Sequence, residues 1–349
     1  MQRSSIRGLL TVVAIALLGA CARAVDPVPG LEGERALTPT SPAASSPESI
    51  SIRTVDQVEL LHALEGHSGR VMHVAFSADS ARLASSSEDM TILVWDAGTG
   101  QETYTIPMTR RDMADIAFSP EGNLLASGEA VWDVESRQEL YVLERDRQVP
   151  AKVAFSPDGS TLAVAVMNQP MQLWDAAAGE IIRTFAMQAE PLAFNIQFSP
   201  DGAMLAAGGL GGRITLWDAA SGQLAATLEY GDESGVHAVA FAPDGQMLAT
   251  GGTMPSIRLW DVSTGEVLDT LMLPDGLFGL AFSPDGTILA SAGGAERAIV
   301  LWDVESGERL RSLPHGDQIM AIAFSPDGRL LAAGGVDGRV TLWGIPADR

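Results

Sequence analysis

The chain has 349 residues, of which 36 are glycine and only 19% are charged. Lysine and arginine number 22 against 44 aspartates and glutamates, so the formal net charge is −22 at pH 7. A chain this acidic is repelled by nucleic acid phosphates, which argues against a nucleic-acid-binding protein. The single cysteine, Cys21, excludes an intrachain disulfide and a cysteine-based metal site.

Residues 1–20 have the pattern of an export signal. Arg3 and Arg7 lie in a first segment without acidic residues, and an apolar run follows from Leu9 to Ala20. This run is shorter than the roughly 20 apolar residues that cross a bilayer, and its length is typical of a signal peptide. We therefore expect residues 1–20 to be cleaved from the mature protein.

The apolar run ends in Leu-Gly-Ala directly before Cys21. This ending resembles the lipobox of bacterial lipoproteins, in which the chain is cut before the cysteine and the thiol carries a diacylglycerol. The resemblance implies that Cys21 is the lipid attachment site, and two or more acyl chains make a stable membrane anchor. A generic cleaved signal with an incidental cysteine is the alternative interpretation.

Residues 21–51 are rich in proline, serine, alanine and threonine and show no hydrophobic period. This composition is typical of a flexible tether, here one that would hold a domain away from a membrane. We expect three parts: a signal over 1–20, a lipid-anchored linker over 21–51 and a folded domain over 52–349. The predicted location is the cell envelope, on the extracytoplasmic side of a membrane.

The folded domain consists of repeats. The motif Phe-Ser-Pro-Asp-Gly, or a close variant, begins seven times, at Phe76, Phe118, Phe155, Phe198, Phe241, Phe282 and Phe324. A tryptophan follows each copy: Trp95, Trp132, Trp174, Trp217, Trp260, Trp302 and Trp343. Six of these seven tryptophans precede aspartate. A period of about 40–45 residues with a Trp-Asp ending is typical of a four-stranded propeller blade.

Residues 52–349 therefore resemble the WD40 family, and the resemblance implies an all-β, seven-bladed β-propeller. The residues themselves support four strands in a blade. An apolar run such as residues 71–76 suits a strand buried on both faces, and Pro-Asp-Gly supplies a tight turn. A Ser-Gly or Thr-Gly turn after Trp-Asp then leads to the fourth strand.

The two ends of the repeat region predict how the ring closes. Only six residues follow Trp343, too few for a turn and a fourth strand. Residues 55–64 precede the first inner strand and align with the fourth strands of other repeats. We expect this N-terminal strand to complete the last blade, which removes an exposed sheet edge.

WD40 blades often contain a buried polar tetrad of histidine, serine or threonine, aspartate and tryptophan. The first blade matches it with His67, Ser85, Asp89 and Trp95. The resemblance implies a structural role, because each polar group satisfies another.

The other blades depart from this pattern. The seventh keeps His315, Asp337 and Trp343 but has Ala333 at the hydroxyl position, so apolar contacts should hold the ring more than polar networks do. The second blade is five residues shorter than the first between its second and third strands, which predicts a stunted hairpin and a notch.

The repeats agree in the Pro-Asp-Gly and Trp-Asp turns and diverge in the loops that, in the family's fold, lie on the opposite face. Binding is usually found on such loops, and arginine and large aromatic residues are favoured at interfaces. The candidate partner contacts are Arg70, Arg111, Arg147, Phe194, Tyr230 and Phe278. Packing between blades is the alternative for the phenylalanines, and a solvated loop position is the alternative for each arginine.

Signals of catalysis are weak. No two of the five histidines have a metal-ligand spacing, and there is neither a Gly-x-Ser-x-Gly elbow nor a Walker loop. We therefore expect no enzyme, no metal and no cofactor. A site in the channel would need polar residues to converge from the inner strands, which offer a scattered few: His73, Asp115, Lys152, Asn195 and His237.

Two functions remain open. The first is a membrane-anchored, monomeric scaffold for protein partners in the envelope. The second is a small-ligand or glycan binder, with or without weak hydrolase activity, that uses the channel mouth. Saturable binding of a purified protein favours the first function. Small-molecule binding that is lost on changing His73 or Asp115 favours the second.

Overall fold

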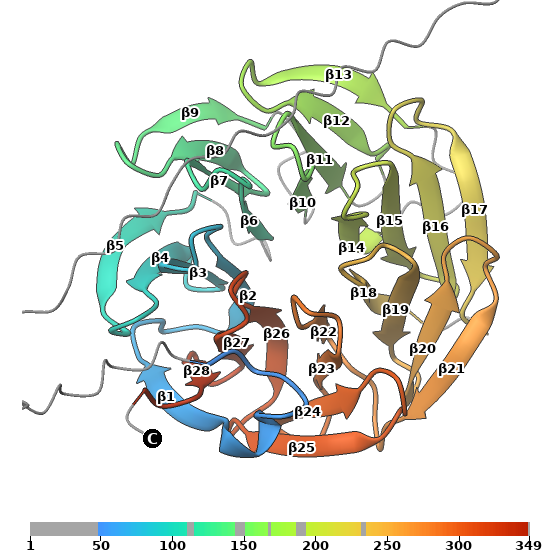
Figure 1. The fold of residues 1–349 in the computed structure, drawn as a ribbon. Coiled ribbons are helices and arrows are strands. Elements are labelled where there is room, and N and C mark those ends of the chain that lie inside the picture. The colour runs from blue at the N-terminus through green and yellow to red at the C-terminus, as the bar shows by residue number, and fades with distance from the viewer. Residues whose placement is uncertain are drawn as a thin grey trace, which may run out of the picture. The chain divides into compact units, whose positions relative to one another are not determined.

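The computed structural model describes residues 48–109, 115–143, 151–166, 169–185, 193–231 and 235–347. The predicted signal, the lipid site Cys21 and most of the linker lie outside these ranges, as do Arg111 and Arg147. Within these ranges no helix has the length and apolarity that crossing a bilayer requires. Seven four-stranded antiparallel sheets form a ring (Figure 1), which confirms the all-β, seven-bladed propeller.

Each blade is built from four strands in order from the centre outwards, with one short 3-10 helix, η1 (Val55–Gln57), outside the blades. The inner strands are β2 (Val71–Phe76), β6 (Ile116–Phe118), β10 (Ala151–Phe155), β14 (Ala193–Phe198), β18 (Val236–Phe241), β22 (Gly279–Phe282) and β26 (Ile319–Phe324). The second strands are β3 (Arg82–Ser87), β7 (Leu124–Ser127), β11 (Thr161–Val166), β15 (Met204–Gly209), β19 (Met247–Gly252), β23 (Ile288–Ala292) and β27 (Leu330–Gly335).

The third strands carry the repeated tryptophans, and the fourth strands form the rim of the ring. The third strands are β4 (Thr91–Asp96), β8 (Ala130–Asp133), β12 (Gln172–Asp175), β16 (Arg213–Asp218), β20 (Ser256–Asp261), β24 (Ala298–Asp303) and β28 (Val340–Gly344). The fourth strands are β5 (Glu102–Pro107), β9 (Glu139–Val142), β13 (Glu180–Thr184), β17 (Leu224–Glu229), β21 (Val267–Met272), β25 (Arg309–Pro314) and β1 (Glu59–Leu64).

The N-terminal strand closes the ring as predicted. β1 pairs antiparallel with β28, and the seventh sheet has the order β1-β28-β27-β26. Figure 1 shows the blue β1 beside the red β28. A second tie holds the same end of the chain, because Arg311 Nη1 donates a hydrogen bond to the carbonyl of Val55 at 2.7 Å. The β28 edge is therefore covered, and it offers no template for pairing with another chain.

The core lies between the blades. The described residues form seven apolar clusters, each of which contains one of the seven tryptophans. Trp95 of the first blade, for example, packs in one cluster with Val340 and Leu342 of the seventh. The tryptophans are between 2% and 6% exposed. Burying a large apolar side chain contributes roughly 1.5–3 kcal/mol, so each contact between blades is a main source of stability.

The repeated turns have a structural explanation. In the fourth blade Ser199 Oγ donates to Asp201 Oδ1 at 2.6 Å and accepts from the Met204 N–H at 2.9 Å. Gly202 has a φ of +72°, which only glycine adopts at no steric cost. After the tryptophan, Asp218 Oδ1 accepts the N–H of Ser221 at 2.7 Å. These carboxylates bind their own turns, so turn geometry accounts for the motif.

The second blade has the shortened hairpin that its length predicts. β7 and β8 have four residues each and pair through only three register positions. Buried Glu129 lies in the turn between them, where Oε2 accepts hydrogen bonds from N and Oγ1 of Thr109 at 3.0 and 3.2 Å. A hollow of about 490 Å³ lies beside Glu129 and Trp132.

The closing strand supplies a matched pair of leucines for a stability test. Leu64 is 3% exposed and packs between the first and seventh blades, whereas Leu60 on the same strand is 48% exposed. We expect Leu64→Ala to lower the free energy of unfolding by about 2–5 kcal/mol because it leaves a cavity. Leu60→Ala should change it by less than about 0.5 kcal/mol in the same urea titration. Equal, small effects would contradict the role of β1 in closing the ring.

Candidate functional site

One position of the repeat, in or next to the inner strands, lines the centre of the ring in six of the seven blades, with Ala238 as the exception. It is the residue three places before the motif phenylalanine, and in chain order it is His73, Asp115, Lys152, Asn195, Ala238, Gly279 and Ala321. The first four blades thus place polar residues at this level, and the last three place small ones. The inner strands surround the centre of the ring (Figure 1), so the polar residues at this position come from one run of neighbouring blades and the small residues from the other.

A cavity of about 350 Å³ lies at this level. All seven blades contribute to its lining, which contains all five polar residues noted on the inner strands: His73, Asp115, Lys152, Asn195 and His237. Its apolar lining includes Met72, Phe194, Phe278, Leu280, Met320 and Ile322. The volume falls within the range of small-molecule sites, which are mostly apolar with a few convergent polar groups.

Three of the polar side chains form a hydrogen-bonded chain across neighbouring blades. His73 Nδ1 lies 2.9 Å from Asp115 Oδ1, and Lys152 Nζ lies 2.9 Å from His73 Nε2. Asp115 Oδ2 also accepts the N–H of Val153 at 3.2 Å. A carboxylate only accepts, so His73 Nδ1 carries the proton, and its Nε2 accepts from the amine of Lys152.

The charges of this chain follow from burial and from the partners. Burial lowers the pKa of His73; the charge of Lys152 acts in the same direction, while Asp115 opposes it. Burial opposes ionisation of Asp115, but His73, Lys152 and the backbone N–H of Val153 outweigh it and lower the pKa of Asp115 to about 2. Burial also lowers the pKa of Lys152, and Asp115 partly offsets this effect. At neutral pH, Asp115 is therefore ionised and His73 is neutral.

An aromatic cluster forms the next part of the wall. The ring of His237 stacks on Phe278, with centroids 5.3 Å apart and planes at 17°. Phe194 meets the same imidazole edge to face, at 5.0 Å and 73°. Burial lowers the pKa of His237, and the charge of Lys152 adds to this effect. Phe194 and Phe278 thus pack within the ring and also line the cavity.

Of the remaining candidate partner contacts, Arg70 is exposed and Tyr230 is buried. The side chain of Arg70 is 55% exposed directly before β2, with Nε 3.8 Å from Glu88 Oε2. Tyr230 is only 1% exposed, because its ring packs in the cluster between the fourth and fifth blades and its hydroxyl donates to the carbonyl of Ser256. The expectation that Tyr230 contacts a partner was therefore wrong. Arg111 and Arg147 lie outside the described residues.

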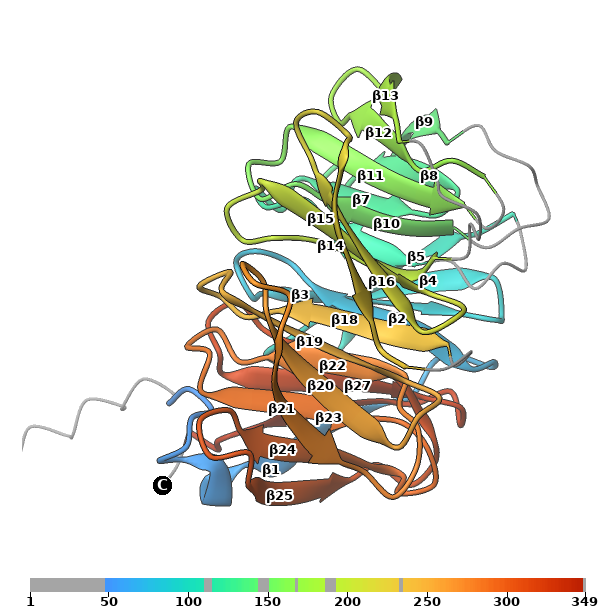
Figure 2. The same ribbon diagram turned by 90° about the vertical axis from the view of Figure 1, so that its right-hand side faces the viewer.

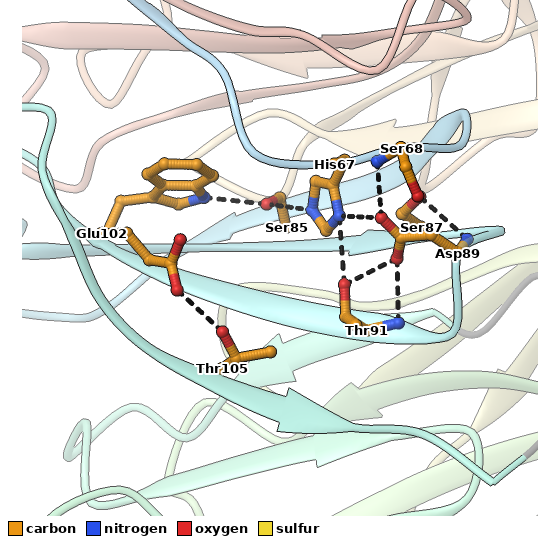
Figure 3. A network of polar contacts seen from close by, with 9 residues as sticks. His67, Ser68, Ser85, Ser87, Asp89, Thr91, Glu102 and Thr105 are labelled. Carbon is orange, nitrogen blue, oxygen red and sulfur yellow. Dashed lines mark hydrogen bonds and ion pairs between the residues drawn. The ribbon is translucent and has the colours of Figure 1, made fainter.

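The tetrad of the first blade is assembled and structural (Figure 3). Trp95 Nε1 donates to Ser85 Oγ at 2.8 Å, and that hydroxyl lies 2.8 Å from His67 Nε2. His67 Nδ1 lies 3.0 Å from Asp89 Oδ2, which also accepts the N–H of Ser68. The imidazole is fully enclosed, and none of the four residues lines the channel cavity.

The seventh blade has a related network, built with a residue that the sequence analysis missed, in which His315 Nε2 lies 3.6 Å from Asp337 Oδ1 without a hydrogen bond. Thr341 stands opposite Ala333 in the β27–β28 register. Its Oγ1 accepts from Trp343 Nε1 at 3.1 Å and lies 2.9 Å from His315 Nδ1. The missing hydroxyl is thus supplied from the neighbouring strand. The signal was a threonine two residues before the tryptophan, which alignment along one strand does not reveal.

Metal binding has no support in the part of the chain that the structure describes. There, no group of three or more His, Cys, Asp or Glu residues is arranged to hold an ion. Many of the carboxylates accept hydrogen bonds in the repeated turns instead.

Known proteins share the repeats of this chain. The family described as "WD domain, G-beta repeat" matches residues 58–96, 265–303 and 307–344. The family described as "Eukaryotic translation initiation factor eIF2A" matches residues 134–266.

Similar curated proteins match over short stretches. WD repeat-containing protein SL1-17 of Schistosoma mansoni is 40% identical over 75 residues, which is 22% of this chain and 25% of that protein. A guanine nucleotide-binding protein subunit beta of Arabidopsis thaliana is 33% identical over 86 residues, which is 25% of this chain and 22% of that protein. The chain thus spans a quarter or less of the relatives it matches.

The Asp115 carboxylate predicts a pH-dependent contribution to stability. Its pKa is lowered from 3.8 to about 2 in the folded chain, so it stabilises the fold above its unfolded pKa. This contribution, about 2 kcal/mol, is lost as the pH falls through 3.8 towards 2. We expect Asp115→Asn to lower the free energy of unfolding at neutral pH and the difference from wild type to shrink near about pH 3.

Asp56→Asn is the matched control, because it removes the same charge from an exposed side chain. It should have a small effect at both pH values in the same urea titrations. An Asp115→Asn difference that does not change with pH would contradict a charged, hydrogen-bonded Asp115.

Proposed function

Because the chain is a seven-bladed β-propeller containing WD40 repeats, we propose that it is a non-catalytic scaffold that binds a protein partner at the cell envelope. WD40 propellers generally bind protein partners. Several relatives are named as the beta subunit of a guanine nucleotide-binding protein, which by its name is one part of an assembly.

The observation that supports this proposal is the difference between the two faces of the ring. The strands cross the thickness of the ring, so their connections lie at two opposite faces (Figure 2). On one face the turns repeat because their serines and aspartates bind their own backbone. On the other face the connections differ from blade to blade. A rigid ring that displays variable loops is the usual arrangement for recognition.

Reversing one charge on each face tests which face binds the partner, the one with variable connections (the partner face) or the one with repeated turns (the turn face). Arg70 lies directly before the inner strand β2, whereas Arg329 lies in the turn after the inner strand β26, at the opposite face. Their side chains are 55% and 42% exposed. In a crosslinking pull-down from envelope extract, we expect Arg70→Glu to lose a stoichiometric protein partner and Arg329→Glu to retain it. A partner lost only with Arg329→Glu would place the interface on the turn face.

Membrane attachment through Cys21 is part of the same proposal and is supported by the lipobox resemblance alone. Cys21 carries the lipid, residues 22–51 act as the tether, and the ring faces the extracytoplasmic side. We expect Cys21→Ser to move the protein from the membrane to the soluble fraction and to abolish metabolic labelling with palmitate. Membrane retention of the unlabelled variant would contradict lipid anchoring.

The channel cavity supports small-molecule binding as a second candidate function. Its specific support is the convergence of five polar side chains from the first five blades on one cavity of about 350 Å³. The expected behaviour is saturable binding of a small molecule that changes of His73 or Asp115 weaken. This function is compatible with the first, because the cavity lies in the centre of the ring and the partner face is built from its loops.

A further inference from the structure

Lys152, the only lysine in the chain, is the one lysine or arginine among the residues that line the channel cavity. Its amine lies in the wall of the cavity and makes one hydrogen bond, to His73 Nε2 at 2.9 Å. No second partner for Nζ is seen among the described residues. In its protonated form the amine has three donors, so two N–H groups are left for a ligand.

The oxygens of Asp115 accept hydrogen bonds from groups other than Lys152 Nζ. Asp115 Oδ1 already accepts from His73 Nδ1 at 2.9 Å and from the Ile116 N–H at 3.2 Å. Its Oδ2 accepts from the Val153 N–H at 3.2 Å. The neutral imidazole therefore lies between the carboxylate and the amine, and both oxygens of Asp115 already accept hydrogen bonds from other groups. Among the described carboxylates, only Asp115 acts on the pKa of Lys152.

A second donor lies one blade further. Asn195 occupies the same position of β14 that Lys152 occupies of β10, and it lines the same cavity. Its amide makes no hydrogen bond with the described residues. The side-chain N–H₂ of asparagine donates two hydrogen bonds. Lys152 and Asn195 together therefore offer adjacent donors for one group with several acceptor oxygens.

The sixth and seventh blades offer the cavity no polar side chain. Phe278, Leu280, Met320 and Ile322 line this part of the wall, and the small residues Gly279 and Ala321 at the level of Lys152 keep it open. Desolvating a charged or hydroxylated group against this surface is costly. A ligand that fills the cavity must therefore be polar at one end and apolar at the other.

We propose that the channel cavity binds a small organic carboxylate, with its carboxylate on Lys152 and Asn195 and its apolar or aromatic body against Phe278, Leu280 and Met320. This inference rests on the small-molecule function proposed above and specifies its ligand class. A glycan does not fit this cavity, because its hydroxyl groups would face the apolar half of the wall.

The charge requirement is tested with matched pairs of probes and the full chain. Phenylacetate and hexanoate are compared with phenylacetamide and hexanamide by isothermal titration calorimetry. Each amide has the shape of its acid without the charge. We expect the carboxylates to bind at least about tenfold more tightly than the amides, because a hydrogen bond to a charged group is worth about 1.5–3 kcal/mol.

Two variants test whether the preference for carboxylates depends on the charge of Lys152. Lys152→Met keeps the length of the side chain and removes its cation, and it should abolish the preference for the carboxylates. Arg213→Met removes one positive charge from an exposed position on β16 and should leave the preference intact. Binding that weakens equally in both variants would show only a general effect of net charge and would overturn the proposal.

If Lys152→Met does not fold, the affinities of the four probes for the wild-type chain still test the proposal. Amides that bind as tightly as carboxylates would overturn the carboxylate assignment and leave small-molecule binding in the channel standing. Failure of all four probes would overturn the carboxylate assignment. A wider set of uncharged compounds would then decide whether the channel binds small molecules at all.

Discussion

The burial of a tryptophan at each contact between blades is the interaction on which this structure depends. A single four-stranded blade cannot cover its own apolar faces, so stability requires neighbours on both sides and a closed ring. Among the described residues, a histidine joins the tryptophan and a hydroxyl group in the first and seventh blades. In two other blades the indole N–H donates to a hydroxyl alone, Thr250 Oγ1 for Trp260 at 2.7 Å and Ser291 Oγ for Trp302 at 2.8 Å.

Ring closure also creates the candidate site. Each blade has one residue at the level of Lys152, and no two of these residues are close in the sequence. Six of the seven, all but Ala238, line one cavity, so the chemistry of the cavity depends on how the blades differ at this position. Four consecutive blades supply polar groups, and three supply small ones. The result is a two-sided cavity with one cation, in a chain whose net charge is −22.

Local patterns predicted the fold because each blade is specified within about 40 residues. The Pro-Asp-Gly turns, the tryptophan positions, the shortened second blade and the closing strand all follow from spacing along the chain. The exposure of individual side chains, in contrast, could not be predicted from spacing along the chain. Tyr230 was expected to contact a partner because it is a large aromatic residue in a variable loop, yet packing between two blades encloses it. Thr341 was missed because its role is set by the strand beside it.

The sequence by itself determined the number of blades, the turn chemistry and the way the ring closes, because these depend on short-range periodicity and on residues with special backbone preferences. It also showed His73, Asp115, Lys152, Asn195 and His237 as isolated polar residues on apolar strands. Only the tertiary structure decided that they share one cavity and that His73 bridges Asp115 and Lys152. The physical reason is that these contacts join side chains 42 and 79 residues apart in the sequence, and the closed ring of blades sets the distance between them.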